Sequence, residues 1–288
     1  MFIAINGQLG SGKSELCKRL EEEYGFDVFH TGKIQREYAA ELGISTLELN
    51  RLCKTDKRFD KIIDSKLVEY AERVRGTDVV FDSRMAWHFV PGVFKVHLLV
   101  SPDIAADRVY GKRESVEETY SSREEAMAEL VERSMLENER YQSVYGVTMN
   151  DYRNYDLILD TSLLTVKEEL DIILDAAKKH EESGAYNGIF VSPVSLYPTA
   201  PYDAGDKEAR VVKRGESLYI VSGHRKVREA VLRGERLMEV KLAAEEAAAT
   251  DENGVVNTDR EILKDWEEMC GFRYGYIPLE VRAAGMKG

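Results

Sequence analysis

The residues best suited to chemistry lie within the first fourteen positions. Gly7–Ser14 follows the pattern G-x-x-x-x-G-K-S, with a four-residue apolar run before it and apolar residues at helical spacing after it. This context predicts a strand, a glycine-rich loop and a helix. Such a loop turns backbone N–H groups toward a phosphate, and the helix N-terminus adds a positive end. We expect a nucleoside triphosphate site; a plain glycine turn is the alternative.

Two side chains of this loop have expected roles. Lys13 would reach the β- and γ-phosphates, and the Ser14 hydroxyl would bind Mg²⁺. Backbone groups of the other loop residues would hold the phosphates. The predicted triphosphate-binding residues are Gly7, Gly10, Ser11, Gly12, Lys13 and Ser14.

Polar residues also follow two later apolar runs, at the edge where parallel sheets collect ligands. Thr31, Gly32 and Arg36 come after the second run, and Arg36 would clamp an acceptor phosphate through two hydrogen bonds. Asp82 and Arg84 end the third run, where Asp82 would organise Mg²⁺ through water and Arg84 would face the acceptor. The alternatives are a solvent-facing helix arginine and a loop-initiating aspartate.

Further cations lie in the region 111–140, which holds nine acids against five bases. Arg133, Glu137 and Arg140 are spaced by four and three residues and share one helix face. Glu137 would orient the two arginines toward a transferring phosphoryl group, where arginine stabilises charge in the transition state. A solvated ion-pair stripe is the alternative.

A second pair of arginines lies just before this helix. Arg108 and Arg113 flank the residues Tyr-Gly-Lys, where a mobile cover over the phosphates would begin. Arg113 is predicted to take part in catalysis. Arg108 would lie at the start of this cover or, alternatively, would simply be an exposed arginine on a helix surface.

The elements that must position these residues alternate between strand and helix over residues 1 to about 180, which predicts a parallel sheet with crossover helices. A long charged helix is expected to run to about Tyr145. Later strands are predicted at 26–30, 78–82, 95–100 and 155–160, and a helix is predicted at 33–42. Capping boxes are predicted at Ser45/Glu48, Ser122/Glu125, Thr165/Glu168 and Thr258/Glu261.

The pattern changes after a polar, glycine-containing segment at 178–188, which we interpret as a linker. Beyond it we expect a hairpin around Gly215 and a helix that follows it. The prediction is an α/β domain at 1–180 and a smaller α+β domain at 181–288.

Composition limits the possible partners. The 288 residues are 43% hydrophobic, with a formal charge of -12 and three widely spaced cysteines. The acidic balance argues against nucleic acid as a partner, and no apolar run is long enough for a membrane span. The cysteines form no C-x-x-C pair, and the N-terminus reads as a core strand; we therefore expect a cytoplasmic protein that acts on small molecules.

Several stretches of the first domain carry a family resemblance. They are GQLGSGKS, HTGKIQRE, DSRMAWHFVPGVFKVHLLV, ADRVYGKRES, ERSMLENERYQSVYGV and YDLILDTS. In this order they resemble cytidylate kinase, in its compact archaeal-type form, among the adenylate-kinase-like P-loop kinases. The resemblance implies a five-stranded parallel sheet of order 2-3-1-4-5, a flexible lid, and transfer of the γ-phosphoryl group of ATP to a pyrimidine nucleoside monophosphate.

The resemblance also assigns roles to single residues. Lys13 and Ser14 match the triphosphate and Mg²⁺ positions, and Arg36 and Arg84 match the acceptor-phosphate positions. Arg133 and Arg140 match the lid arginines. Two positions depart from the pattern: Met85 stands where bacterial members have a base-reading aspartate, and Gln35 replaces a residue that is often aromatic.

Such a transfer needs no general base, because the attacking oxygen belongs to a phosphate that is already ionised. At about 4 Å two unit charges repel by roughly 4 kcal/mol in a partly shielded site, and arginines and Mg²⁺ must cancel several such terms. No catalytic histidine is therefore expected.

The second domain resembles a strand, turn and helix of ParB-like and sulfiredoxin-like domains that binds a nucleotide phosphate. The matching residues are Gly223, His224, Arg225 and Arg228, within 207–241, which holds ten bases against five acids. A plain strand-to-helix turn is the alternative. The acidic stretch 245–268, with nine acids against two bases, argues against DNA as the ligand.

The sequence thus predicts an ATP- and Mg²⁺-dependent nucleoside monophosphate kinase that prefers CMP or dCMP. One alternative is a small-molecule kinase with another acceptor, for which Asp82 is the candidate base. The other is a regulatory protein that uses the first domain as a nucleotide sensor.

Overall fold

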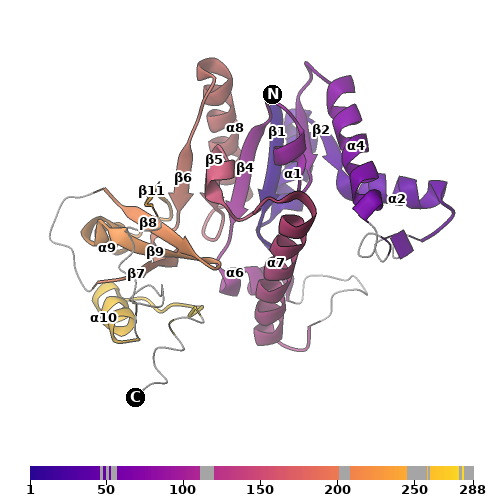
Figure 1. Ribbon diagram of the computed structural model, residues 1–288. Helices are drawn as coiled ribbons and strands as arrows, with labels where there is room; N and C mark the ends of the chain where they lie inside the picture. The colour runs from indigo at the N-terminus through magenta and orange to yellow at the C-terminus, as the bar shows by residue number, and fades with distance from the viewer. Residues whose placement is uncertain are drawn as a thin grey trace. The chain divides into compact units, whose positions relative to one another are not determined.

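The structure of the protein is a computed structural model (Figure 1). It describes residues 1–45, 48–49, 52, 57–110, 120–200, 208–244, 258, 260–278 and 281, without the side chains of residues 57 and 60. The chain forms two compact units, described separately below. The first comprises Met1–Leu98, Ser134–Thr161 and Thr165–Asn187, and the second Leu99–Arg133, Ser162–Leu164 and Gly188–Gly288.

Five strands in the order β5-β4-β1-β3-β2 form the sheet of the first unit. β1 pairs in parallel with β3 and β4, and β3 pairs in parallel with β2. This arrangement confirms the expected order 2-3-1-4-5. The strands are β1 (Phe2–Gly7), β2 (Asp27–His30), β3 (Val79–Asp82), β4 (Phe94–Leu99) and β5 (Leu157–Asp160).

Helices cover this sheet because each connection between parallel strands must return along a face. α1 buries Leu16, Cys17 and Leu20 and contacts β1, β2, β3 and α8. α2 and α4 pack together at the β2 side of the sheet (Figure 1). The helices are α1 (Lys13–Tyr24), α2 (Thr31–Glu41), α4 (Lys57–Arg73), α5 (Ala86–Phe89), α7 (Arg123–Tyr145), of which the part from Ser134 belongs here, the 3-10 helix η1 (Tyr152–Asn154) and α8 (Val166–Ser183).

Of the predicted capping boxes, the structure shows one in full and the serine half of two others. Ser45 and Ser122 each accept a hydrogen bond at 3.1 Å from the N–H group three residues later. Thr165 forms a complete capping box with Glu168 at the start of α8. These local signals therefore set the helix starts.

Two predicted boundaries were wrong. The second helix starts at Thr31 and not at residue 33, so Thr31 and Gly32 lie in its first turn. α8 continues to Ser183 and ends at Gly184, whose φ is 76°. The first half of the predicted linker 178–188 is therefore helical, because its polar residues lie on the exposed side of α8. The division into domains at 180/181 stays a prediction.

The second unit contains a four-stranded sheet in the order β11-β8-β9-β7. β8 and β9 form the predicted antiparallel hairpin around Gly215, and Tyr197, Val212, Tyr219, Leu263 and Val281 form a core beside it. β6 also pairs with β10, in the antiparallel direction. The elements are α6 (Pro102–Val109), β6 (Gly188–Val191), η2 (Pro193–Ser195), β7 (Leu196–Pro198), β8 (Arg210–Arg214), β9 (Ser217–Ser222), α9 (His224–Leu232), β10 (Met238–Glu239), β11 (Lys241–Leu242) and α10 (Arg260–Cys270).

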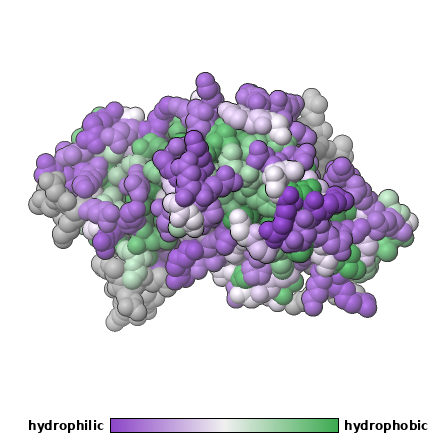
Figure 2. Space-filling model, turned by 90° about the horizontal axis from the view of Figure 1, so that it is seen from above, coloured by the Kyte–Doolittle hydropathy of each residue, from purple (hydrophilic) through white to green (hydrophobic). Residues whose placement is uncertain are grey.

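Hydrophilic residues cover most of the surface in the view from above (Figure 2). This agrees with the charged fraction of 32%. None of the helices in the described part of the chain is both long and apolar enough to cross a membrane.

Candidate active site

The glycine-rich loop fits its surroundings closely. A Cβ on Gly7 would lie 2.8 Å from the Cβ of Leu98 and 2.9 Å from its carbonyl oxygen, so this position has no room for a side chain. Gly12, with φ of 90°, directly precedes α1, and no side chain caps that helix. The N–H groups of the first turn therefore lack intrahelical partners. Together with the helix dipole, they form a site suited to an anion.

The loop is anchored from behind by the end of β5. The Thr161 hydroxyl donates a hydrogen bond to the Ser11 carbonyl oxygen at 2.9 Å, and both residues are buried. Gln8 is held from the β4 side, where its N–H donates to the Leu98 carbonyl at 2.9 Å. These contacts fix the loop without using the side chain of Lys13.

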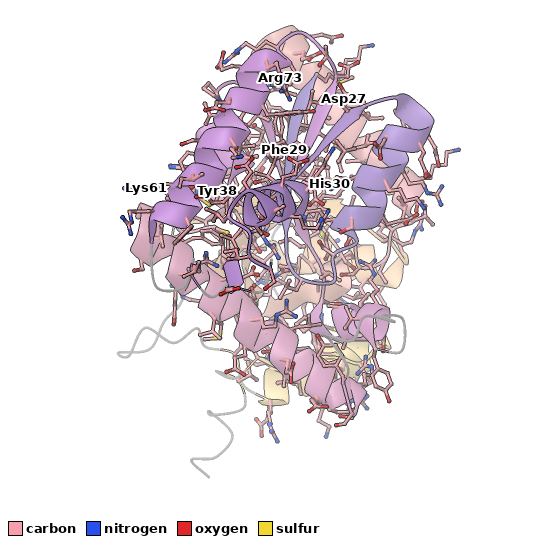
Figure 3. The ribbon with its side chains drawn as sticks, turned by 90° about the vertical axis from the view of Figure 1, so that its right-hand side faces the viewer. Asp27, Phe29, His30, Tyr38, Lys61 and Arg73 are labelled. Atoms are coloured by element: carbon pink, nitrogen blue, oxygen red, sulfur yellow. The ribbon has the colours of Figure 1, made fainter. Side chains whose placement is uncertain are left out.

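Lys13 forms an ion pair with Asp82 at the end of β3. The other carboxylate oxygen of Asp82 lies 3.1 Å from Nδ1 of His30. His30, labelled in Figure 3, is the last residue of β2. Because a carboxylate accepts, Nδ1 carries the proton. Although Lys13 contacts Asp82, burial of its ammonium and the positive charge of Arg84 lower the pKa of Lys13 to about 8. Burial, with the nearby cations, also lowers the pKa of His30, which keeps its ring neutral near pH 7.

Arg84 is held by two contacts. Its Nη1 donates to the Gly7 carbonyl oxygen at 2.5 Å, and its Nη2 lies 3.2 Å from Oε2 of Glu137 on α7. The carboxylate that was expected to orient Arg133 and Arg140 thus holds Arg84, which follows β3. A guanidinium fixed in this way can meet a phosphate with little loss of side-chain entropy.

A cavity of about 300 Å³ lies beside the loop, and it is formed within the first unit. It brings together six of the predicted site residues, from the loop, from the first turn of α2, from the end of β3 and from α7. The lining residues are Lys13, Thr31, Gly32, Gln35, Ile63, Asp64, Asp82, Ser83, Arg84, Met85, Arg140, Tyr141 and Tyr145. The carboxyl ends of β1 and β3 therefore open into one space, as expected of a parallel sheet.

The other predicted residues lie elsewhere. Arg36 is exposed, and its neighbour Gln35 lines the cavity. Ser14 is exposed in the first turn of α1. Arg133 belongs to the second unit, and Arg113 lies outside the described residues. The roles of these four residues stay predictions.

Sequence reasoning did not single out the far wall of the cavity. Asp64 and Ile63 come from α4, and Tyr141 and Tyr145 from α7. The tyrosines stack on each other with ring centroids 5.9 Å apart, and the Tyr145 hydroxyl donates to Oδ2 of Asp64 at 2.5 Å. The four-residue spacing of the tyrosines was visible in the sequence, but the direction in which Asp64 points was not.

The second predicted phosphate site has a different character. Gly223, with φ of 75°, has no room for a Cβ, which would lie 2.7 Å from Cα of Ala209. His224 is buried, and its Nε2 accepts a hydrogen bond from the Thr199 N–H at 3.2 Å. Arg225 pairs with Glu229 at 2.8 Å. The phosphate role of these residues and of the half-buried Arg228 stays a prediction.

Comparison with known proteins covers the part of the chain that forms this cavity. The model of the cytidylate kinase-like family matches residues 2–163. The chain belongs to the cytidylate kinase-like family. It is therefore a kinase with the P-loop α/β fold, and its family supports phosphoryl transfer to a nucleoside monophosphate.

Two kinds of related protein share the region that matches the family model. Cytidylate kinase from Pyrobaculum aerophilum is 34% identical over 177 residues, which cover 61% of this chain and 91% of the relative. Cytidylate kinase from Methanothrix thermoacetophila is 35% identical, covering 62% and 98%. An S-adenosylmethionine-dependent nucleotide dehydratase from Lacinutrix mariniflava is 32% identical over 178 residues, but this match spans only 36% of that protein.

Proposed function

We propose that the protein transfers the γ-phosphoryl group of ATP, with Mg²⁺, to CMP or dCMP. The observation that carries this proposal is the meeting of Lys13, Arg84 and Arg140 in one cavity at the carboxyl ends of β1 and β3. Three cations from separate elements in one space fit two phosphate groups that must approach each other. The relatives named cytidylate kinase support the choice of base.

In the proposed reaction an oxygen of the acceptor phosphate attacks the γ-phosphorus, and the bond from that phosphorus to the bridging oxygen of ADP breaks. The acceptor is already an anion, so no proton has to be removed. Lys13 would move from Asp82 to the β- and γ-phosphates. Arg84 and Arg140 would offset the repulsion between donor and acceptor, while Thr31, Gly32 and Arg36 would hold the acceptor phosphate.

Oxygen donors suited to Mg²⁺ are present at the loop. Ser14 offers a hydroxyl, and Asp82 offers a carboxylate that would act directly or through water. The described residues contain no group of three or more His, Cys, Asp or Glu side chains able to hold a metal. This fits Mg²⁺ in kinases, which relies on one or two protein oxygens together with phosphates and water. When bound, the ion would neutralise charge on the phosphates.

A coupled assay that measures ADP formation with each common nucleoside monophosphate tests the proposal. We expect the highest kcat/KM with CMP or dCMP, and no turnover with any monophosphate would reject the proposal. Arg84→Ala should raise the KM for the acceptor by about tenfold or more, because a charged hydrogen bond is lost. Arg75→Ala is the matched control, since this exposed arginine pairs with Glu72 and lies outside the cavity lining.

A kinase acting on an acceptor hydroxyl is the second candidate, because the carboxylate of Asp82 lines the cavity and could remove a proton. The contacts of its two oxygens with Lys13 and His30 favour a charge-positioning role instead. If nucleoside monophosphates fail as substrates, a screen of sugar and amino-acid acceptors with Asp82→Asn would separate these candidates. Tight ATP binding without turnover of any acceptor would instead favour a nucleotide sensor.

A further inference from the structure

The last residues of β2 and β3 lie side by side. His30 ends β2, Asp82 ends β3, and the parallel register of the two strands pairs them directly. The preceding pair, Phe29 and Phe81, is buried, with ring centroids 5.9 Å apart. Because successive residues of a strand point to opposite faces of a sheet, His30 and Asp82 share the face opposite to these rings. The strand pairing therefore directs His30 at Asp82; Phe29 and His30 are labelled in Figure 3.

Asp82 is held at three points. Its Oδ2 lies 3.1 Å from Nδ1 of His30, and its Oδ1 pairs with Lys13. Its main-chain carbonyl oxygen accepts a hydrogen bond of 3.4 Å from the Thr31 hydroxyl. The side chain of Asp82 is only 14% exposed, whereas that of His30 is 41% exposed. The two side-chain contacts use two of about four acceptor positions on the carboxylate, so the group keeps room for a water or a cation.

The tautomer of His30 limits what this residue can do. Nδ1 carries the proton that Asp82 accepts, so Nε2 of the neutral ring has a lone pair and no proton. The ring therefore has no proton to donate to a phosphate oxygen. In the described part of the chain, His30 is also not one of the residues that line the cavity. Its influence on the site passes through Asp82, which does line it.

The two side-chain partners of Asp82 behave differently in the proposed reaction. Lys13 leaves Asp82 for the β- and γ-phosphates, whereas His30 has no reason to move. A neutral imidazole fixes the direction of the carboxylate without cancelling its negative charge, so the charge stays available for a cation. A carboxylate fixed in advance also loses less rotamer freedom when it meets an ion, which favours the bound state.

We infer that His30 is a positioning residue that keeps Asp82 oriented toward Mg²⁺ once Lys13 has turned to the phosphates. This inference rests on the proposed function and adds a residue of β2 to it. Removal of a hydrogen-bond partner from a metal-binding carboxylate typically lowers metal affinity or activity by about 10–100-fold. Because Thr31 and the strand pairing still hold the main chain of Asp82, we expect the lower end of this range.

The experiment measures Mg²⁺ binding without turnover. Mg²⁺ is titrated by calorimetry into protein that is in excess over a non-hydrolysable ATP analogue, so that all of the analogue is bound. In His30→Ala the Kd for Mg²⁺ should rise by about tenfold, while the Kd for the analogue without Mg²⁺ stays within about twofold. His30→Asn, whose amide nitrogen can replace Nδ1 as donor, should restore most of the affinity. His88→Ala removes an exposed histidine outside the cavity lining; it is the matched control and should change neither constant.

Two further measurements separate positioning from a structural role. In His30→Ala, kcat with CMP should fall by about tenfold while the KM for CMP stays within about twofold, because the acceptor site is unchanged. In an Asp82→Asn background, His30→Ala should cause little further rise in the Kd for Mg²⁺, because His30 acts through that carboxylate.

An unchanged Kd for Mg²⁺ in His30→Ala would overturn the inference and leave the proposed function intact. The same holds for an equal loss in the Asp82→Asn background, or for an equal loss of analogue binding without Mg²⁺, which would show a structural role. If no monophosphate is phosphorylated, the proposed function fails, and the Mg²⁺ titration decides the inference alone. Wild-type protein that binds neither the analogue nor Mg²⁺ would overturn both.

Discussion

The turn before α1 and the turn before α9 use the same backbone device. In each, a glycine in the left-handed region directly precedes the helix, with φ of 90° at Gly12 and 75° at Gly223, and no side chain caps the helix. Their first side chains differ. Lys13 lines a cavity together with Arg84, whereas His224 is buried and accepts a hydrogen bond from the Thr199 backbone.

This difference shows what a glycine turn leaves undecided. The N–H groups at a helix start suit an anion in both places. At the first turn, however, the segment after β3 supplies Arg84 and α7 supplies Arg140, so the cations converge on one space. At the second turn Arg225 pairs with Glu229 of its own helix. Convergence of side chains from other elements, rather than the turn, distinguishes the active-site candidate.

Among the changes proposed for the two turns, removal of the Lys13 side chain should have the largest effect, on the rate of phosphoryl transfer. Lys13→Ala should lower kcat for phosphoryl transfer by at least about 10³-fold, because it removes a cation aimed at the transferred group. Lys13→Arg, which keeps the charge, should retain more activity. Steady-state kinetics with ATP and CMP would measure both variants, after circular dichroism has shown that they are folded. Activity of Lys13→Ala within tenfold of wild type would contradict the assigned role.

His224→Ala should produce the next largest effect, on stability and not on catalysis. The change leaves a hole next to Trp266, whose ring centroid lies 6.2 Å away, and removes the acceptor for the Thr199 N–H. We expect the free energy of unfolding to fall by about 2–4 kcal/mol. Denaturant unfolding would measure this loss. At denaturant concentrations where the variant is still folded, its kcat should stay within about twofold of wild type. A large loss of kcat in the folded variant would assign His224 a role beyond packing.

The sequence predicted the local structure around each site residue better than it predicted which of these side chains come together in space. The loop, the strand ends and the capping boxes depend on short-range rules, and the structure shows the predicted strand order. Asp64 was not predicted because its place in the cavity depends on which way α4 faces. That direction is fixed by contacts with other helices, such as Tyr38 with Phe59 and Tyr145 with Asp64, which no local pattern reveals. Likewise, Glu137 contacts Arg84 across 53 positions, a pairing that helical spacing within α7 does not reveal.

The pH dependence of ATP use should distinguish the two turns, because the first residue of α1 is the half-buried Lys13 and the first residue of α9 is His224. The pKa of Lys13 is lowered to about 8, and phosphate binding requires the protonated form. The kcat/KM for ATP should therefore fall as pH rises through about 8, by up to about tenfold per pH unit, since this parameter reports the free enzyme. In Lys13→Arg the fall should be absent near pH 8, because arginine stays charged.

Stability should respond to the same group with the opposite sign. A lysine in an unfolded chain has a pKa of 10.5, so between about pH 8 and 10.5 the unfolded chain holds more of the proton at Lys13 than the folded chain. The contribution of Lys13 to the free energy of unfolding therefore rises with pH over this window. The difference between wild type and Lys13→Arg in denaturant unfolding at pH 7.5 and 10 would measure it, and a difference independent of pH would contradict the lowered pKa.

Arg225→Ala should have the smallest effect. Arg225 is half-buried, and its ion pair with Glu229 lies within one helix with both side chains partly in solvent, where such pairs contribute little to stability. The thermal midpoint should shift by no more than about 2 °C. The predicted phosphate role is tested in the same variant by calorimetric titration with CTP, ATP and inorganic phosphate, in a Lys13→Ala background that weakens the first site. Loss of a binding event in Arg225→Ala that persists in Arg233→Ala, an exposed arginine of the same region, would show that the second turn also holds an anion and would remove the contrast between the two turns.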